Sequence, residues 1–419
     1  MQTNEFEETP LGLLPREWPL VPIGSLGEVI TGRTPNTNED KYYGGFYKLI
    51  SPANLGGKIY VDTAHKWLSE EGLAISRVLP KDTILVSCIG YIGKTGLTSD
   101  EKSATNQQIN AIICNANADP RFIYFLMTYW QSYIEKFARV TTIPILNKNN
   151  FEAIEVPLPP LPEQRAIAHV LTTVRQAIEA TERVIEATRQ LKKSMMKHLF
   201  SYGPVPVDQV DRVQLKETEI GLIPEGWNIS SLKDIIILSG RNIQPKNTLH
   251  LPYVGLEHIE PGNCNFVSWG NPLEVKSSKT HFEKGNILYG KLRPYLDKAI
   301  VADREGICST DILVFSVKCN IDPNFVGHIL HTRPFIDYAI STTAGVNHPR
   351  TSWNSIQEFH FALPPNDVQI EISSALSVID NKIAVERKRK EILENLFQSF
   401  LYQLMTGTIR VDNRILLIR

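Results

Sequence analysis

The sequence predicts an α+β protein in which two copies of one mixed α/β domain are separated by two long helices that pair antiparallel, like a coiled coil. Three observations support this fold class: landmarks that occur twice in the same order, short strand-like runs in each copy, and a helix-seam period at the end of each copy. The expected divisions are residues 1–157 for the first domain, 158–203 for its helix, 204–362 for the second domain, and 363–419 for its helix and tail.

The repeat is clearest at the start of each copy. ETPLGLLPREW, from Glu8 to Trp18, returns as ETEIGLIPEGW, from Glu217 to Trp227. Later landmarks return in the same order, with Asp119-Pro120 matched by Asp322-Pro323 and Leu158-Pro159-Pro160 matched by Leu363-Pro364-Pro365. Self-similarity at this spacing indicates a duplicated domain.

Local patterns predict the elements of each copy. Runs of β-branched and aliphatic residues bounded by Gly, Asp and Asn are typical of strands, at Thr83–Ser87, Asn110–Cys114 and Ile312–Val317. Asp119 and Asp322 each precede a proline, which is the pattern of a helix N-cap with Pro at the first helical position. Each copy is therefore expected to mix strands with short helices.

After each proline pair the apolar residues follow the spacing of a coiled-coil seam. Each helix is expected to be about 35 residues, or about 50 Å, long. Glu386 and Lys390 interrupt the second stripe. The predicted seam residues are Ile167, Leu171, Val174, Ile178, Ile185, Leu191, Met195 and Leu199 in the first helix, and Ile372, Leu376, Ile379, Ile383, Leu393, Leu396, Phe400 and Leu404 in the second.

Composition limits the classes of protein. With 419 residues, 42% hydrophobic and 21% charged, the chain can bury two or three domain cores. No apolar run approaches the roughly 18 residues of a membrane span, and the acidic start does not resemble a signal peptide, so we expect a cytoplasmic protein with no membrane partner. A net charge of −1 means that any phosphate-binding surface is local or is supplied partly by partner proteins.

The sequence predicts neither a metal site nor a disulfide framework. The five cysteines include no C-x-x-C pair, and we interpret them as buried thiols. The ten histidines are scattered without metal-ligand spacing.

No catalytic residues are predicted. Cys88 to Thr95 resembles a phosphate loop, but Cys88 stands where the motif needs glycine. Asp322-Pro-Asn-Phe325 resembles the D-P-P-Y loop of adenine methyltransferases, although its counterpart Asp119-Pro-Arg-Phe122 favours a helix start used twice. LPPLPEQR, from Leu158 to Arg165, is interpreted as a structural hinge rather than a polyproline ligand.

Taken together, these features resemble the specificity subunits of type I restriction-modification systems over essentially the whole chain. The resemblance rests on short motifs in a fixed order: Gly12 to Trp18 and Gly221 to Trp227, Lys81-Asp82 and Lys284-Gly285 before strands, Ile92-Gly93-Lys94, Thr105 to Ile109, PLPPLPEQR, and Leu404 to Arg410. Singly each motif is weak, but their repeated order is specific.

The resemblance implies two target-recognition domains, each reading one part of a split, asymmetric site in double-stranded DNA. It also implies that the helices form a spacer that docks two methyltransferase (modification) subunits, within a DNA methylation and host-defence complex. Those subunits would hold S-adenosylmethionine, and restriction/translocase subunits would carry the nuclease. This chain itself would need no cofactor and would not be an enzyme.

Candidate DNA-binding residues come from the regions where the copies diverge, 33–80 and 241–283, and from two later loops in each copy. Arg, Lys, Asn, Gln and Ser are the types that address base edges and phosphates. The candidates are Arg33, Lys48, Ser51, Asn54, Lys58, Lys94, Asn106, Gln107 and Gln108 in the first copy, and Arg241, Asn242, Lys246, His258, Arg293, Tyr295, Lys298, His348 and Arg350 in the second.

Two alternatives belong to other classes. One is a fused adenine methyltransferase with its own recognition domain, which would require a Gly-rich cofactor loop. The other is a structural coiled-coil scaffold with protein-binding domains. Steeply salt-dependent DNA binding would separate a DNA reader from a scaffold.

Overall fold

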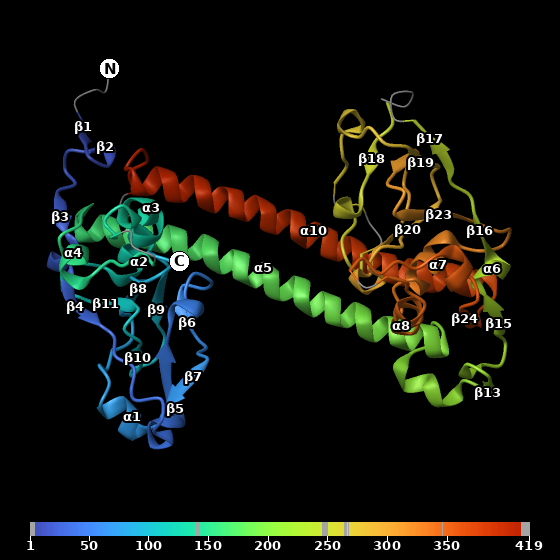
Figure 1. Cartoon of the computed structure of the whole chain (residues 1–419), viewed down its shortest axis with the longest axis horizontal. Helices are drawn as coiled ribbons and strands as arrows, with labels where there is room; N and C mark the ends of the chain where they lie inside the picture. Colours follow the sequence, from blue (N-terminus) through green and yellow to red (C-terminus); the bar gives the residue numbers. More distant parts are fainter. Residues whose placement is uncertain are drawn as a thin grey trace. The chain divides into compact units, whose positions relative to one another are not determined.

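The computed structural model describes residues 5–139, 143–244, 250–263, 266, 268–345 and 347–411. It divides into two compact units, Met1–Ala180 with Lys390–Arg419, and Thr181–Arg389. The long helix α5 (Leu161–Tyr202) runs from the first unit into the second, and α10 (Asn366–Met405) runs from the second into the first (Figure 1). The predicted class, two mixed α/β domains with two long helices, is confirmed.

The first unit contains a five-stranded sheet in the order β4-β11-β8-β9-β6, antiparallel except for the parallel β9–β6 edge. Its strands are β4 (Gly27–Thr31), β6 (Tyr60–Val61), β8 (Ile84–Ser87), β9 (Thr95–Thr98) and β11 (Ile109–Cys114). A second sheet, β10-β5-β7, consists of β5 (Tyr43–Ile50), β7 (Lys66–Leu68) and β10 (Ala104–Thr105). The remaining elements are the strand pairs β1 (Phe6–Thr9) with β2 (Gly12–Pro15) and β3 (Leu20–Pro22) with β12 (Glu155–Pro157), and the helices α1 (Glu70–Ala74), α2 (Pro120–Tyr129), α3 (Gln131–Glu135) and α4 (Lys148–Glu152).

The second unit contains two four-stranded sheets. The first, β16-β23-β20-β21, consists of β16 (Ile236–Leu238), β20 (Ile287–Gly290), β21 (Ala299–Val301) and β23 (Ile312–Val317). The second, β17-β19-β22-β18, consists of β17 (Arg241–Ile243), β18 (Tyr253–Val254), β19 (Lys279–Phe282) and β22 (Gly306–Cys308). The remaining elements are the pairs β13 (Leu215–Thr218) with β14 (Gly221–Pro224) and β15 (Asn228–Ser231) with β24 (His360–Leu363), and the helices α6 (Leu232–Ile235), α7 (Pro323–Ile329), α8 (Arg333–Ser341) and α9 (Trp353–Ile356).

The topology confirms the repeat. The antiparallel order β4-β11-β8-β9 in the first unit matches β16-β23-β20-β21 in the second, and both strand pairs also recur. The copies differ most in the second sheet, where β5 and β7 of the first copy and β17, β18 and β19 of the second come from the divergent regions, although the parallel pair β10–β5 recurs as β22–β18. The frame is therefore duplicated, while the divergent regions fold in their own way.

The repeated box at the start of each copy forms a hairpin that leads to a buried tryptophan. Gly12 (φ +98°) and Gly221 (φ +103°) make the turns β1–β2 and β13–β14 in backbone conformations that favour glycine. Trp18 and Trp227 are 2% and 5% exposed and belong to the main cores of their units. The box thus fixes the entry of each domain.

A buried glutamine joins each long helix to its domain. The side-chain Oε1 of Gln164 accepts from the Asp119 N–H at 2.9 Å, and that of Gln369 accepts from the Asp322 N–H at 3.1 Å. The two amide groups also donate to Pro159 and Pro364 carbonyls. Both aspartates cap α2 and α7, as predicted. The proline pairs therefore serve as structural helix entries.

The long helices have 42 and 40 residues, which is longer than the predicted 35. Within each unit, one end of α5 packs on the opposite end of α10. In the first unit Ile167, Leu171 and Ile178 share a core with Leu404. In the second unit Ile185 packs with Ile379 and Ile383. Among the described residues, no helix is long and apolar enough to span a membrane.

Two predicted seam residues are wrong. Leu191 and Leu396 are 53% and 39% exposed, whereas their neighbours Lys192 and Phe397 are 5% and 7% exposed. A seven-residue repeat from Ile185 passes through Lys192, which pattern reading skips because it is charged. At this one position of each helix the buried residue is one later than predicted. The other predicted seam residues are buried or half-buried.

The tail after α10 closes the first unit. The guanidinium of Arg410 pairs with Glu163 at 2.6 Å and with Glu17 at 3.0 Å, and lies 5.7 Å from the ring centre of Trp18. Trp18 also donates to Glu163 at 3.1 Å. The segment just after α10 is thus bound to the start of the first domain.

We predict that Gln164→Ala and Gln369→Ala each destabilise the full-length protein. Either change leaves buried backbone groups without a partner, which costs about 1–3 kcal/mol. Urea unfolding measures the loss, with Gln209→Ala in an exposed segment as the control. Unfolding midpoints equal to that of the control would contradict the structural role of the two glutamines.

Candidate nucleic-acid interface

Each domain presents a hairpin loop in the same place. The β8–β9 loop (Cys88–Lys94) and the β20–β21 loop (Lys291–Lys298) connect equivalent antiparallel strands. Because Thr95 begins a strand and not a helix, the first loop is not a phosphate loop. The same loop position therefore carries different sequences in the two domains.

A second loop in each domain closes over the hairpin through backbone hydrogen bonds. In the first unit Gly90 N–H donates to the Pro144 carbonyl at 3.0 Å, and in the second Arg293 N–H donates to the Pro349 carbonyl at 2.8 Å. Thr351 N–H also donates to the Lys291 carbonyl. These bonds use backbone atoms alone, so they close the loops without side-chain contacts.

The hairpin in the second unit is strained at an arginine. Arg293 and Asp297 adopt left-handed φ values of 52° and 50°. The left-handed conformation costs roughly 1–2 kcal/mol for a residue with a side chain. Arg293 Nε is buried and has no hydrogen-bond partner among the described residues. Strain and an unsatisfied donor at one residue point to a functional role.

Each hairpin also exposes a tyrosine three residues before a lysine. Tyr91 is 78% exposed and Tyr295 is 53% exposed. Lys94 Nζ lies 5.0 Å from the centre of the Tyr91 ring. Lys298 instead donates to the Leu256 carbonyl at 2.5 Å, and burial lowers its pKa. The sequence prediction missed Tyr91, which alignment with Tyr295 would have found.

In the first unit, several predicted residues come together beside the hairpin. Asn106 donates to the side chain of Gln108 at 2.9 Å, and the Gln108 carbonyl accepts from the Cys88 N–H at 2.7 Å. Arg33 is exposed, and its N–H donates to the Thr105 carbonyl. Gln107 is exposed and accepts from Thr34. Arginine and amide side chains therefore surround the base of this loop.

The prediction that Lys48 contacts DNA is wrong, because its side chain is only 5% exposed. Lys48 Nζ pairs with Asp100 at 2.8 Å and donates to Ser99 and to the Val61 carbonyl. It is a structural lysine.

Three other candidates of the first unit lie in the stretch before the β6 strand. Ser51 and Asn54 bond to each other and cap a 3-10 helix (Pro52–Asn54), and both are half-buried. Lys58 is exposed and pairs with Asp62. Ser51 and Asn54 therefore shape this loop, whereas Lys58 keeps an exposed amine.

In the second unit, predicted residues fall into two groups. The first group lies at the β20–β21 loop, where the backbone of Arg350 bridges to Leu292 and its guanidinium pairs with Asp311 at 3.1 Å. His348 is exposed in the same closing segment, Asn347–Thr351. Together with Arg293 and Tyr295, these residues form a basic and aromatic loop surface.

The second group belongs to the other sheet. Arg241 and Asn242 are exposed on the edge strand β17. His258 is half-buried, its Nδ1 accepts from the Gly255 N–H at 2.8 Å, and its ring packs on Tyr253. Lys246 lies outside the described residues. His258 is therefore committed to its turn, while the edge strand stays accessible.

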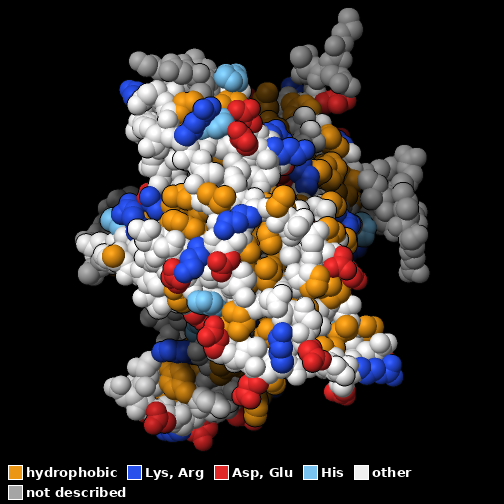
Figure 2. Space-filling view, turned by 90° about the vertical axis from the view of Figure 1, so that its right-hand side faces the viewer, with side chains coloured by type: hydrophobic (Ala, Val, Ile, Leu, Met, Phe, Trp, Pro, Cys, Tyr) orange, Lys and Arg blue, Asp and Glu red, His pale blue; other side chains and the backbone are white. Residues whose placement is uncertain are grey.

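Charge on the visible face of the molecule is mixed. Figure 2 shows lysine, arginine and acidic side chains interspersed with hydrophobic patches on the described surface. On this face the charges are mixed, in agreement with the net charge of −1 of the whole chain.

The described residues offer no group of three or more His, Cys, Asp or Glu side chains that could hold a metal ion. The carboxylates of Asp119 and Asp322 are used as helix caps, which supports the helix-start interpretation over a D-P-P-Y loop. Cys88 and Cys308 are buried thiols as expected, but Cys319 is exposed, so the interpretation of all cysteines as buried is wrong.

Comparison with known proteins agrees with this architecture. The family model for the type I restriction modification DNA specificity domain matches residues 15–188 and 224–395. The chain therefore belongs to this family. Its resemblance to specificity subunits is confirmed, whereas a fused methyltransferase is not supported.

Two relatives illustrate the match. The chain is 26% identical to the type I restriction enzyme MjaVIII specificity subunit of Methanocaldococcus jannaschii, over 98% of this chain and 97% of that protein. It is 25% identical to the EcoDI specificity subunit of Escherichia coli, over 96% and 91%. Among solved structures, the S subunit from M. genitalium has a similar fold, with a TM-score of 0.63 at 18% identity, over 96% and 97% of the two chains. The chain is thus a DNA specificity subunit of a type I restriction-modification system.

We predict that thiol reagents at pH 8 modify Cys319 well before Cys88, Cys114 and Cys308. Burial raises the pKa of Cys88 to about 11 and those of Cys114 and Cys308 to about 12. Little thiolate, the reactive form, is therefore present at these sites. Alkylation followed by peptide mass spectrometry measures the order. Equal rates at Cys88 and Cys319 would contradict the burial of Cys88.

Proposed function

We propose that each domain reads one part of a split, asymmetric site in double-stranded DNA. The supporting observation is the contrast between a duplicated frame and divergent loops at the same position of each copy. A reader needs a constant scaffold with variable contact residues. Two different readers in one chain fit two different half-sites.

The proposed contact surface is the hairpin loop of each domain with its closing loop. Arg33, Lys94 and Gln107 in the first domain, and Arg293 and Arg350 in the second, are types that bind base edges and phosphates. Tyr91 and Tyr295 add an exposed aromatic surface to each hairpin. The proposed DNA-contacting surface also includes the other residues predicted from the sequence, except the buried Lys48. Within it, Ser51, Asn54 and His258 shape the loops.

We further propose that the chain is not an enzyme and needs no cofactor. Methylation, with S-adenosylmethionine, would occur in two methyltransferase subunits docked on the helices, and cleavage in restriction/translocase subunits. Family membership supports this division of labour. The complex would act in the cytoplasm, and the domains would follow the limits 1–157, 158–203, 204–362 and 363–419.

We predict that replacing residues 20–155 by the matching domain of a relative changes one half of the methylated site and leaves the other intact. Each domain has its own frame and loops, so their readouts are independent. Sequencing of methylated adenines in a host that expresses the assembled complex measures both halves. A hybrid that changes both halves of the site would contradict the proposal that each domain reads one half independently. A purified complex that shows no salt-dependent DNA binding would instead favour a structural scaffold.

We predict that Tyr91→Ala and Lys94→Ala weaken DNA binding by the assembled complex, while Lys233→Ala does not. Loss of one phosphate contact by Lys94 lowers the salt slope by about one. The Tyr91 change removes an exposed aromatic surface from the same loop and should also weaken binding. Binding titrations at several salt concentrations measure both effects. Wild-type affinity in both variants would exclude the β8–β9 loop from the interface.

A further inference from the structure

The two long helices meet through different chemistry at equivalent positions. Position 192 of α5 is equivalent to 397 of α10, and position 175 is equivalent to 380, at the spacing that separates Leu158 from Leu363. In the second unit the facing pair is Lys192 and Asp380. In the first unit it is Phe397 and Arg175. One crossing geometry is thus occupied once by an ion pair and once by a cation and an aromatic ring.

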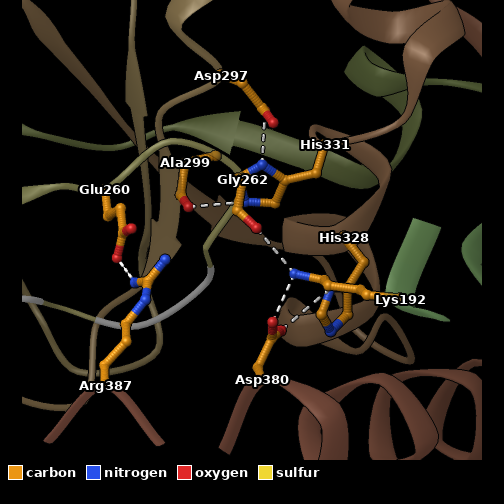
Figure 3. Close-up of polar contacts among 9 residues, drawn as sticks. All are labelled: Lys192, Glu260, Gly262, Asp297, Ala299, His328, His331, Asp380 and Arg387. Carbon is orange, nitrogen blue, oxygen red and sulfur yellow. Dashed lines mark hydrogen bonds and ion pairs between the residues drawn. The ribbon is translucent and has the colours of Figure 1, made fainter. Parts of the chain in front are cut away.

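The ion pair in the second unit is buried. Lys192 Nζ lies 2.6 Å from Asp380 Oδ1, and the two side chains are 6% and 4% exposed. Lys192 also donates to the Gly262 carbonyl at 3.0 Å, and His328 Nδ1 lies 3.9 Å from Asp380 Oδ2 (Figure 3). Removing either charge would strand the other in the core, where it is costly.

In the first unit the cation of the crossing faces an aromatic ring of α10, and the nearby carboxylate of Glu179, 3.9 Å from Arg175 Nε, belongs to α5 itself. The guanidinium carbon of Arg175 lies 5.8 Å from the centre of the Phe397 ring, and Phe397 is 7% exposed. Phe397 also packs against Phe125 of the domain, with ring centres 6.1 Å apart. The attraction there is between a cation and an aromatic face.

We propose that these two crossing pairs favour the pairing of α5 with α10. They disfavour the pairing of α5 with a second α5, and of α10 with a second α10. If two α5 helices from separate chains paired in the same register, Arg175 would face Lys192. If two α10 helices paired, Asp380 would face Phe397 with no cation. Like charges in one case and an unpaired buried carboxylate in the other disfavour both pairings.

The same residues oppose a slip of the helices by one heptad. A slip in one direction sets Lys192 against Arg387, and a slip in the other sets Arg175 against Lys390. A charged residue at a seam position is a known means of fixing register and partner in coiled coils. The proposal therefore covers both the choice of partner and the alignment of the helices.

The consequence is a protein that stays asymmetric. Pairing of unlike helices combines one first domain with one second domain, whereas pairing of like helices would combine two identical domains. This inference concerns helix pairing and stands whether or not the proposed DNA contacts are correct. For a reader of a split site, it would preserve two different half-sites.

The test uses the full chain with a specific protease site inserted between Asp208 and Gln209, in an exposed segment after α5. After cleavage the halves are joined only by noncovalent contacts. The cut protein is unfolded in urea and refolded, and native mass spectrometry counts pairs of unlike and like halves. We expect wild type to return almost entirely as unlike pairs.

The decisive variant is the charge reversal Lys192→Asp with Asp380→Lys. It keeps an ion pair between unlike helices. Between two α5 helices, however, it sets the introduced carboxylate against Arg175, and between two α10 helices it sets the introduced ammonium against Phe397. We expect the fraction of like pairs to rise by roughly tenfold or more. The matched control is the reversal Lys233→Glu with Glu358→Lys, an exposed pair outside the two long helices, and should behave as wild type.

Melting of the uncut chain provides a second measurement. The single variant Lys192→Asp places two carboxylates at the crossing with Asp380 and should lower the melting temperature, and the double reversal should recover most of that loss. Three results would overturn the proposal. The cut wild-type halves could pair at random, or the cut Lys192→Asp/Asp380→Lys variant could form only unlike pairs. In the uncut chain, this double variant could have a melting temperature as low as that of Lys192→Asp alone.

Discussion

The hydrophobic core of each domain is completed by the end of the long helix from the other half of the chain. Trp18 shares its core with Phe397, Leu401 and Leu404 of α10. Trp227 shares its core with Leu199 of α5, and Phe200 packs against that cluster. A helix that starts in one domain must therefore end in the other. This constraint alone makes the two helices antiparallel and gives each of them two cores to stabilise.

The same constraint explains which parts of the frame recur. Helix caps at Asp119 and Asp322 and the glutamines that bind their backbones hold each helix start against its own domain. The Trp hairpins then receive the far helix end. The ion pairs of Arg410 have no sequence counterpart in the second half, where the chain continues from α5 into the next domain. Val205 stands at the position after α5 that is equivalent to Arg410, so these ion pairs belong to the first unit.

Patterns that depend on near neighbours in the chain were predictable. Strands near 84, 109 and 312, the two capping aspartates and both long helices follow from local spacing, and the order of landmarks revealed the duplication. The prediction failed where a residue's environment depends on distant partners. Lys192 lies in the seam because Asp380 neutralises it, and Lys48 is buried because Asp100 pairs with it. A prediction from hydrophobic spacing assigns Leu191 to the seam instead of Lys192, because such a prediction excludes charged residues from a seam. The location of the candidate interface was partly predictable, because Arg293, Tyr295 and Arg350 do meet at one loop. Tyr91 was missed, although its alignment with Tyr295 would have found it.

Different kinds of hydrogen bond hold the repeated frame and the divergent loops. The loops that carry the candidate contacts are closed by backbone hydrogen bonds, from Gly90 to Pro144 and from Arg293 to Pro349, which do not depend on side-chain identity. The bonds that join the helices to the domains use side chains, Gln164 and Gln369, at repeated positions. Substitution in a loop can therefore alter what the loop contacts without disturbing the frame. Substitution at a helix crossing instead disturbs the packing of α5 on α10 in that unit. The loops can therefore vary more than the frame that carries them. Residues 33–80 and 241–283 also differ widely between the copies, whereas the strand order of the shared four-stranded sheet is the same.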